Sequence, residues 1–198
     1  MTQIISLSKG GTISLGKEDP ALRRVLVGLG WDPRSSSGHE FDLDASAFLL
    51  GSDGRIFDPN QALNAFVFYG NLKLANGSIQ HTGDNRDGQG DGDDEALKVD
   101  LARLDPRVQR IVFAVTIHEA QVRHQNFGMI GSAFIRIANE ETGREVARYD
   151  LTEDASTVTA MIFGELYRYG QDWKFRAVGQ GFQGGLKQMC DTYGVPTE

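Results

Sequence analysis

Short runs in which apolar and polar residues alternate follow one another along most of the chain. Alternation with a period of two is typical of β-strands that bury one face. We expect strands in the runs 22–31, 41–50, 65–70, 77–81, 96–101, 110–118, 132–139, 145–151, 159–169 and 172–179. Turn residues separate several of these runs, at Asn76-Gly77, Thr142-Gly143 and Gly170-Gln171. About ten short strands with little helical periodicity predict an all-β fold, a two-sheet β-sandwich.

The two ends of the chain carry further patterns. The repeated motifs ISLSK (5–9) and ISLGK (13–17) flank two glycines, which predicts a β-hairpin. In the run 58–66, DPNQALNAF, we expect a brief helical turn before the strand at Phe66. Near the C-terminus four residues recur at helical spacing and predict one short helix after Gly184, namely Leu186, Met189, Cys190 and Tyr193. No pattern marks a domain boundary, so residues 1–198 are expected to form a single domain.

The net charge of −7 is concentrated in one place. Residues 83–95, GDNRDGQGDGDDE, hold six carboxylates and one arginine, a net charge of −5, so the other 185 residues carry only −2. A nearly neutral surface outside this acidic segment argues against nucleic acid as a partner, because phosphate binding needs a basic surface. A cation is the natural counterpart of the acidic segment.

The acidic segment has the composition of a divalent-cation site. Two unit charges about 4 Å apart repel by about 4 kcal/mol at an effective dielectric constant of about 20, and the interspersed glycines make the backbone costly to order. A bound cation would remove both penalties. Oxygen donors without thiolates favour Ca²⁺, then Mg²⁺, and glycine lets carbonyls turn toward an ion. No EF-hand register fits, because one that starts at Asp84 places Arg86 at a ligand position and one that starts at Asp87 ends on Lys98.

The remaining ligands must come from elsewhere in the fold. Asp42 and Asp44 lie two residues apart in a predicted strand and therefore face the same side, which makes them the best candidates to complete the site. Glu119, at the end of the run 110–118, could cap the same cluster. The alternative is a solvated acidic loop that binds no metal.

The same motifs occur together in a known family. SLSKGGTISL, VGLGWDPR, FDLDASAFLL, HTGDNRDGQGDGDDE, VTIHEAQ, ARYDLTEDAS, FGELYR and WKFRAVGQGF follow one another over nearly all 198 residues. In these segments the chain resembles the bacterial TerD family of tellurium-resistance and general stress proteins. The resemblance implies a calcium-binding β-sandwich with two neighbouring ions and with ligands at Asp42, Asp44, Asp84, Asn85, Asp93, Asp94 and Glu95. Asp91, in the variable part of the acidic segment, and Glu119 are further candidate ligands.

The resemblance does not settle the molecular activity. We expect a protein without enzymatic activity that acts with other proteins of a stress or tellurium-resistance system, including membrane-associated ones. The chain has neither a basic leader followed by an apolar run nor an apolar stretch near the roughly 18 residues of a membrane span. A single cysteine, Cys190, excludes an intramolecular disulfide and fits a reducing compartment. We therefore expect a cytoplasmic protein that does not insert into a membrane.

Other functions stay open as alternatives. The carboxylate cluster could hold Mg²⁺ for hydrolysis or phosphoryl transfer, or the protein could be a scaffold in which the metal serves only stability. His118, Glu119 and His124 do not form the zinc-protease motif HExxH, because Val122 stands where the second histidine is required. Cys190 lacks a resolving partner and lies on the apolar face of the predicted helix, which disfavours redox chemistry.

Overall fold

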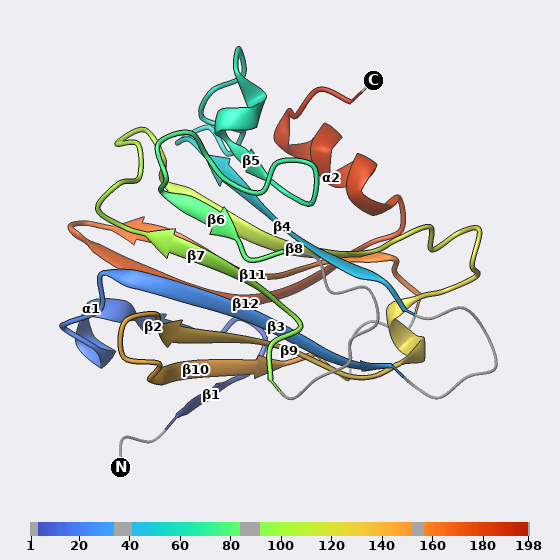
Figure 1. Cartoon of the computed structure of the whole chain (residues 1–198), viewed down its shortest axis with the longest axis horizontal. Coiled ribbons are helices and arrows are strands. Elements are labelled where there is room, and N and C mark those ends of the chain that lie inside the picture. Colours follow the sequence, from blue (N-terminus) through green and yellow to red (C-terminus); the bar gives the residue numbers. More distant parts are fainter. Residues whose placement is uncertain (1–3, 34–40, 84–91, 152–156, 198) are drawn as a thin grey trace.

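The computed structural model describes residues 4–33, 41–83, 92–151 and 157–197, and within them the strands form two six-stranded sheets (Figure 1). Sheet A has the order β1 (Ile5–Leu7), β10 (Glu145–Asp150), β9 (Ile130–Asn139), β3 (Arg24–Pro33), β7 (Glu95–Asp100) and β6 (Ile79–His81). Sheet B has the order β2 (Thr12–Ser14), β12 (Asp172–Phe182), β11 (Ala160–Tyr169), β8 (Arg110–Ile117), β4 (Leu43–Leu50) and β5 (Phe66–Val67). The predicted all-β sandwich is confirmed.

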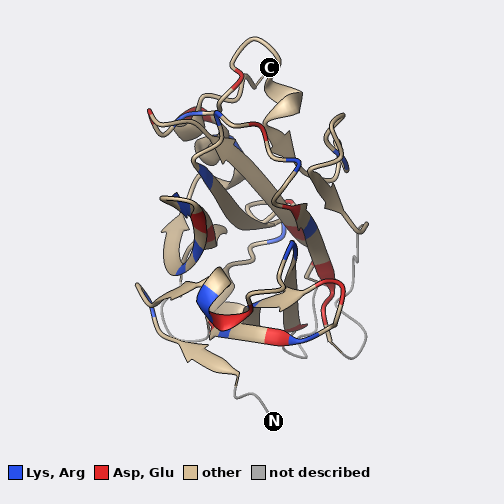
Figure 2. Cartoon of the chain, turned by 90° about the vertical axis from the view of Figure 1, so that its left-hand side faces the viewer, with Lys and Arg blue, Asp and Glu red and all other residues tan. Residues whose placement is uncertain are grey.

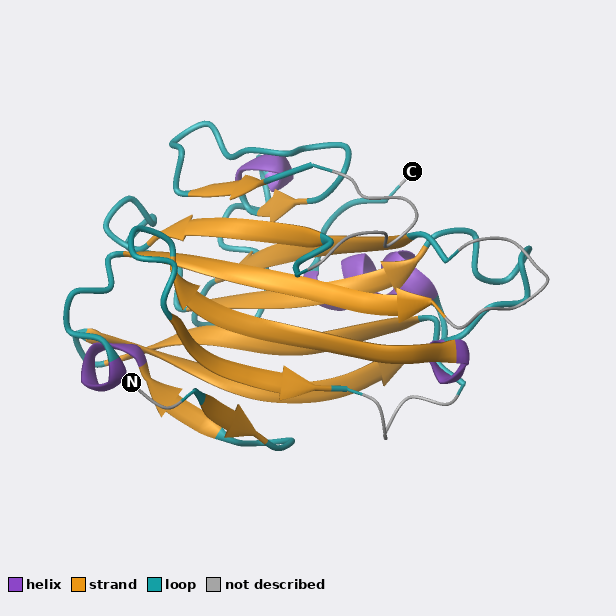
Figure 3. Cartoon of the chain, turned by 60° about the horizontal axis from the view of Figure 1, so that its bottom comes forward, coloured by secondary structure: helices purple, strands orange, loops and turns teal. Residues whose placement is uncertain are grey.

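Helices are short in the described part of the chain (Figure 3). They are α1 (Leu15–Glu18), α2 (Gly185–Tyr193) and the 3₁₀ turns η1 (Ala62–Asn64) and η2 (Phe127–Met129). The predicted C-terminal helix is confirmed as α2, which buries Met189 and Cys190 against the core and ends at Gly194 with φ 80°. The helical turn predicted before Phe66 is η1. The helices among the described residues are all too short to cross a membrane.

The predicted hairpin at residues 5–17 is wrong. A turn does form there, because the Gly11 N–H donates to the Ser8 carbonyl at 2.8 Å, but β1 and β2 do not pair with each other. β1 runs parallel to β10 in sheet A, whereas β2 is antiparallel to β12 in sheet B. The Gly10 N–H donates to Ala177 of β12 at 2.8 Å, so the chain crosses between the sheets at this turn. Each three-residue strand thereby extends the edge of a different sheet.

The alternating pattern of residues 41–50 predicts a strand that buries only one face, but in the structure both faces of this strand are buried. Asp44 and Ser46 do share one face of β4, but every residue of this strand is buried. Phe48 lies on the same face and packs on Tyr193 of α2, with the ring centroids 5.0 Å apart. The side of β4 that carries Asp44 and Ser46 is therefore buried, and α2 packs on it at Phe48.

Candidate functional site

The described end of the acidic segment, residues 92–95, is tied to sheet A by Asp93. Its carboxylate accepts hydrogen bonds from Nε and Nη2 of Arg136 on β9, at 2.6 and 2.7 Å. This ion pair raises the pKa of Arg136 above its ordinary value. The carboxylate lies over Gly28 of β3, the register partner of Arg136, and a Cβ atom at residue 28 would overlap it. Glycine at position 28 thus leaves room for the Asp93–Arg136 pair.

Asp94 is tied to β3. The last register pair between β3 and β7 joins Leu29 to Glu95, and Asp94 extends this pairing by one step. Its N–H donates to the Leu29 carbonyl at 2.7 Å, and its carboxylate accepts the N–H of Trp31 at 2.8 Å. The Asp94 side chain therefore takes the place that a main-chain carbonyl of β7 would hold in a longer ladder.

Glu95 is tied to the other sheet. Glu95 is 2% exposed, and its carboxylate accepts the N–H of Ala45 on β4 at 2.6 Å. The Ala45 N–H points to the same side of β4 as the N–H of Leu49. The Leu49 N–H donates to the carbonyl of Ala65, beside β5. The paired part of β5 reaches only as far as Ala47, so Glu95 supplies the acceptor that the short edge strand lacks at Ala45.

A histidine adjoins the buried Glu95 carboxylate. His81 of β6 is 3% exposed, and its Nε2 lies 3.2 Å from Oε2 of Glu95. Its Nδ1 accepts the N–H of Gly83 at 3.1 Å, which places the proton of a neutral ring on Nε2, toward Glu95. The first and last residues of the acidic segment, Gly83 and Glu95, therefore both lie against His81.

Asp44, His118 and Glu119 form a second group of polar side chains. Asp44 lies on β4 opposite Thr116 and is 9% exposed. The His118 ring stands between two carboxylates, with Nδ1 3.8 Å from Oδ2 of Asp44 and Nε2 4.0 Å from Oε1 of Glu119. The N–H of His118 donates to the Asp42 carbonyl at 2.8 Å, which continues the β4–β8 pairing past its last register pair. The ends of β4 and β8 therefore present these acidic groups together.

Glu119 has an unusual backbone conformation. Its φ is 50°, in the left-handed region that non-glycine residues seldom adopt and that often marks a functional position. Its carboxylate accepts hydrogen bonds from Nε and Nη2 of Arg123, at 3.3 and 3.2 Å. The bend at Glu119 turns the chain after β8 along one side of a pocket of about 460 Å³. Asp44 and His118 also line this pocket, and exposed Tyr69 and Val122 flank it.

The structure brings part of the predicted ligand set together. Glu95 reaches the backbone of β4 one residue from Asp44, whereas Asp93 lies at Arg136 on sheet A. Within residues 4–33, 41–83, 92–151 and 157–197, no three histidine, cysteine, aspartate or glutamate side chains are spaced to hold one ion. Three predicted ligands lie outside the described residues, namely Asp84, Asn85 and Asp91. The fit of the complete set to Ca²⁺ therefore stays a prediction.

Reasoning from the sequence did not identify the residues that hold the acidic segment. His81 had a detectable signal, because it ends a predicted strand two residues before the segment begins. Arg136 had none beyond being a charged residue within an apolar run, since several carboxylates could have been its partner. Gly28 could be assigned a close contact only after the register with Arg136 was known.

Comparison with known proteins agrees with this architecture. The TerD domain family matches residues 3–193. The chain belongs to the TerD domain family. Within this family it is 58% identical over 191 residues to the tellurium resistance protein TerD of Serratia marcescens, which covers 96% of this chain and 97% of that protein.

The chain is also similar to a general stress protein and to a protein of known structure. General stress protein 16U of Bacillus subtilis is 50% identical over 192 residues, which cover 96% of this chain and 97% of that protein. A solved structure of a Streptomyces coelicolor homologue of the telluride resistance protein superposes with a TM-score of 0.67 at 26% identity, covering 85% of this chain and 95% of that one. The chain is thus similar in sequence to a tellurium resistance protein and a general stress protein, and similar in fold to a solved homologue of the telluride resistance protein.

Proposed function

We propose that this protein is a non-enzymatic, calcium-binding stress-response protein in which Ca²⁺ ties the acidic segment to the end of β4. The observation that carries the proposal is the Glu95 carboxylate at the Ala45 N–H, because it brings the acidic segment to the strand that holds Asp44. Two ions would be held by residues from three parts of the chain, namely Asp42, Asp44, Asp84, Asn85, Asp91, Asp93, Asp94, Glu95 and Glu119. As a ligand, Asp93 would share its carboxylate with Arg136.

The charge balance supports a cation. The acidic segment carries a net charge of −5, and Arg136 offsets one of these charges from outside it. The carboxylates of Asp44 and Glu119, on either side of the His118 ring, add two further negative charges beside the segment. A divalent ion with oxygen ligands would offset the remaining repulsion, and Ca²⁺ tolerates such a large, irregular set of donors better than Mg²⁺.

Ion binding would also order a surface for protein partners. The pocket beside Asp44 and Glu119 has an apolar rim that includes Tyr69, 51% exposed, and Val122, 79% exposed. An ion that binds only the ordered form stabilises it by about 2.7 kcal/mol when its free concentration is about a hundredfold above its dissociation constant. We infer that the partners are other proteins of a stress or tellurium-resistance system, and that they contact this rim when the ion is bound.

Isothermal titration of chelator-stripped protein tests the proposal. We expect Ca²⁺ to bind with saturation and more tightly than Mg²⁺, and Asp44→Asn to weaken Ca²⁺ binding at least tenfold. Asp150→Asn is the matched control, because it makes the same charge change at an exposed residue of β10 and should leave the affinity within about twofold. No saturable heat with Ca²⁺, or equal weakening in both variants, would overturn the proposal. Turnover of phosphate esters that Asp44→Asn abolishes would favour the enzyme alternative instead.

A further inference from the structure

Sheet A carries a basic pocket at the end of the sandwich away from the acidic segment. β7 leads from Glu95, in the acidic segment, to Asp100, which lines this pocket. The pocket has a volume of about 230 Å³. Figure 2 faces this end of the molecule, where basic and acidic parts of the ribbon lie side by side. We define the basic pocket by its charged and amide side chains, which are Arg24, Lys73, Gln80, Lys98, Asp100, Arg103 and Glu140.

The strand register places these side chains on one face. Arg24 of β3 is opposite Asp100 of β7, and Lys98 of β7 is opposite Gln80 of β6. Lys73 continues the row through an isolated bridge to Gln80. The residues that alternate with them are fully buried in the core, namely Val25, Ile79 and Val99. The charged side chains must therefore project from the outer face of sheet A.

The basic pocket has an excess of positive charge. Four cations and two carboxylates line it, a formal charge of +2 in a chain whose net charge is −7. Glu141, which lies 3.8 Å from Arg24, would reduce this to +1 if it were counted. The carboxylates at the pocket therefore do not neutralise its cations, and the sign of the local charge is opposite to that of the whole chain.

The existing ion pairs are exposed and easily exchanged. Nζ of Lys98 lies 3.0 Å from Glu140, and Nε of Arg103 lies 3.4 Å from Asp100. The Lys98 and Arg103 side chains are 42% and 65% exposed, and pairs at such sites contribute little to stability. Among the described residues, the side chains of Lys73 and Gln80 have no hydrogen-bond or ion-pair partner. A ligand with several anionic oxygens can thus engage these donors without breaking a strong interaction.

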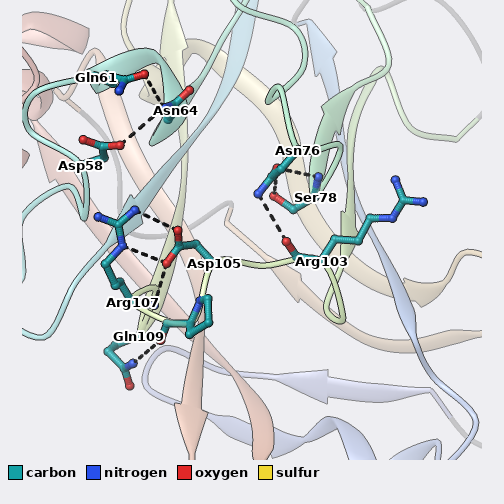
Figure 4. Close-up of polar contacts among 10 residues, drawn as sticks. Asp58, Gln61, Asn64, Asn76, Ser78, Arg103, Asp105, Arg107 and Gln109 are labelled. Atoms are coloured by element: carbon teal, nitrogen blue, oxygen red, sulfur yellow. Dashed lines mark hydrogen bonds and ion pairs between the residues drawn. The ribbon is translucent and has the colours of Figure 1, made fainter.

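Local structure holds the backbone that carries one of the donors, Arg103. Arg103 lies over the turn at Gly77, where a Cβ atom would be 3.0 Å from its Nη1. The turn is held by Asn76, whose Oδ1 accepts the N–H and the hydroxyl of Ser78 and whose Nδ2 donates to the Arg103 carbonyl (Figure 4). The Arg103 side chain extends away from Asp105 in this view, so it is available to the basic pocket.

We propose that the basic pocket binds a phosphate monoester, the phosphate group lying among Arg103, Lys98 and Lys73. A phosphate dianion matches the excess charge, and arginine forms paired hydrogen bonds with phosphate oxygens. The volume corresponds to about eight water molecules at roughly 30 Å³ each, which is room for one phosphate and a short attachment. This site is independent of the proposed calcium site and lies at the other end of β7.

Amide NMR titration of the full chain tests the site, in buffer without Ca²⁺. The probes are inorganic phosphate, glycerol 3-phosphate and vesicles that contain phosphatidic acid. We expect saturable shifts at Gly77, Gln80 and Lys98 with a phosphate probe, and stronger binding at pH 7 than at pH 5, because the dianion forms above a pKa near 6. Binding of the soluble probes alone identifies a metabolite site, whereas binding of the vesicles identifies a lipid headgroup.

Two variants with opposite expected effects on affinity, together with one control, distinguish a specific phosphate site from general electrostatic attraction. Lys98→Gln with Arg103→Gln should weaken phosphate binding at least tenfold, while Glu140→Gln should strengthen it about two- to threefold by removing a competing carboxylate. Lys187→Gln with Arg148→Gln removes the same charge from exposed positions elsewhere and should change the affinity by less than twofold. Shifts that do not saturate, or equal weakening in both double variants, would overturn the proposal.

Discussion

Replacement of Gly28 by alanine should destabilise the protein only while Asp93 is present. The three atoms nearest to a Cβ at residue 28 all belong to the Asp93 carboxylate, which accepts two hydrogen bonds from Arg136 at 2.6 and 2.7 Å. The Arg136 and Asp93 side chains are 22% and 12% exposed, so their pair is stronger than a typical surface ion pair. Hydrogen bonds to charged groups contribute about 1.5–3 kcal/mol each, and partial exposure reduces their sum.

We therefore expect Gly28→Ala to lower the free energy of unfolding by about 2–4 kcal/mol in the otherwise unchanged chain. In the Asp93→Ala background the overlap is gone. Alanine then only reduces the conformational freedom of the unfolded chain, which raises the free energy of unfolding by about 0.4–1 kcal/mol. The two backgrounds should thus differ in sign as well as in size.

The coupling is measured by urea denaturation of four proteins, namely the unchanged chain, Gly28→Ala, Asp93→Ala and the double variant. A buffer that contains a chelator removes any contribution from bound ions. Gly164→Ala serves as the control, because a Cβ there would overlap the Phe175 ring in sheet B. Its cost should be the same with and without Asp93. If Gly28→Ala costs the same in both backgrounds, within about 0.5 kcal/mol, the contact between Gly28 and Asp93 does not explain the glycine.

Three further predictions concern single groups. Glu119→Gly should be more stable to urea than Glu119→Gln by about 1 kcal/mol, because both lose the carboxylate but only glycine relieves the left-handed φ of 50°; equal stabilities would contradict the strain. Burial raises the pKa of Cys190 to about 11. Its reaction with a thiol reagent at pH 8 should therefore be far slower in the folded protein than in urea, and it should accelerate as the pH approaches 11. Rapid labelling of the folded protein at pH 8 would refute this. Hydrogen bonds from Arg107 lower the pKa of Asp105 from 3.8 to about 2, so the stability that this pair contributes is present above pH 4 and is lost as the pH falls toward 2. NMR titration of Asp105 should therefore give a midpoint near 2 that moves toward 3.8 in Arg107→Gln, and an unchanged midpoint would rule out Arg107 as the cause.

Local patterns predicted the strands well because alternation reports directly on a buried face. The runs 110–118 and 159–169 correspond to β8 and β11, and the predicted turn glycines at 77, 143 and 170 all have positive φ. The same patterns could not say which strands are neighbours. The motifs at 5–9 and 13–17 are equally compatible with pairing to each other, and only β10 and β12, more than 100 residues away, decide that they separate.

The candidate site was predictable in composition but not in connectivity. The density of carboxylates pointed to the acidic segment and the spacing of Asp42 and Asp44 to β4, and the contact of Glu95 with Ala45 joins the two. The sequence could not show that Asp93 turns to Arg136 on the outside of sheet A, because that choice depends on the β3–β9 register. Nor could it show that α2 packs on the same face of β4 at Phe48, since this depends on where the C-terminal helix lies.

Crystals of the protein grown with Ca²⁺ test the central claim most directly, through the anomalous difference density of the ion. We predict a peak about 2.3–2.6 Å from oxygen atoms of Asp44 and of the acidic segment, with six to eight ligands in total, roughly. A fully ordered acidic segment with no anomalous peak beside Asp44 at millimolar Ca²⁺ would contradict the account.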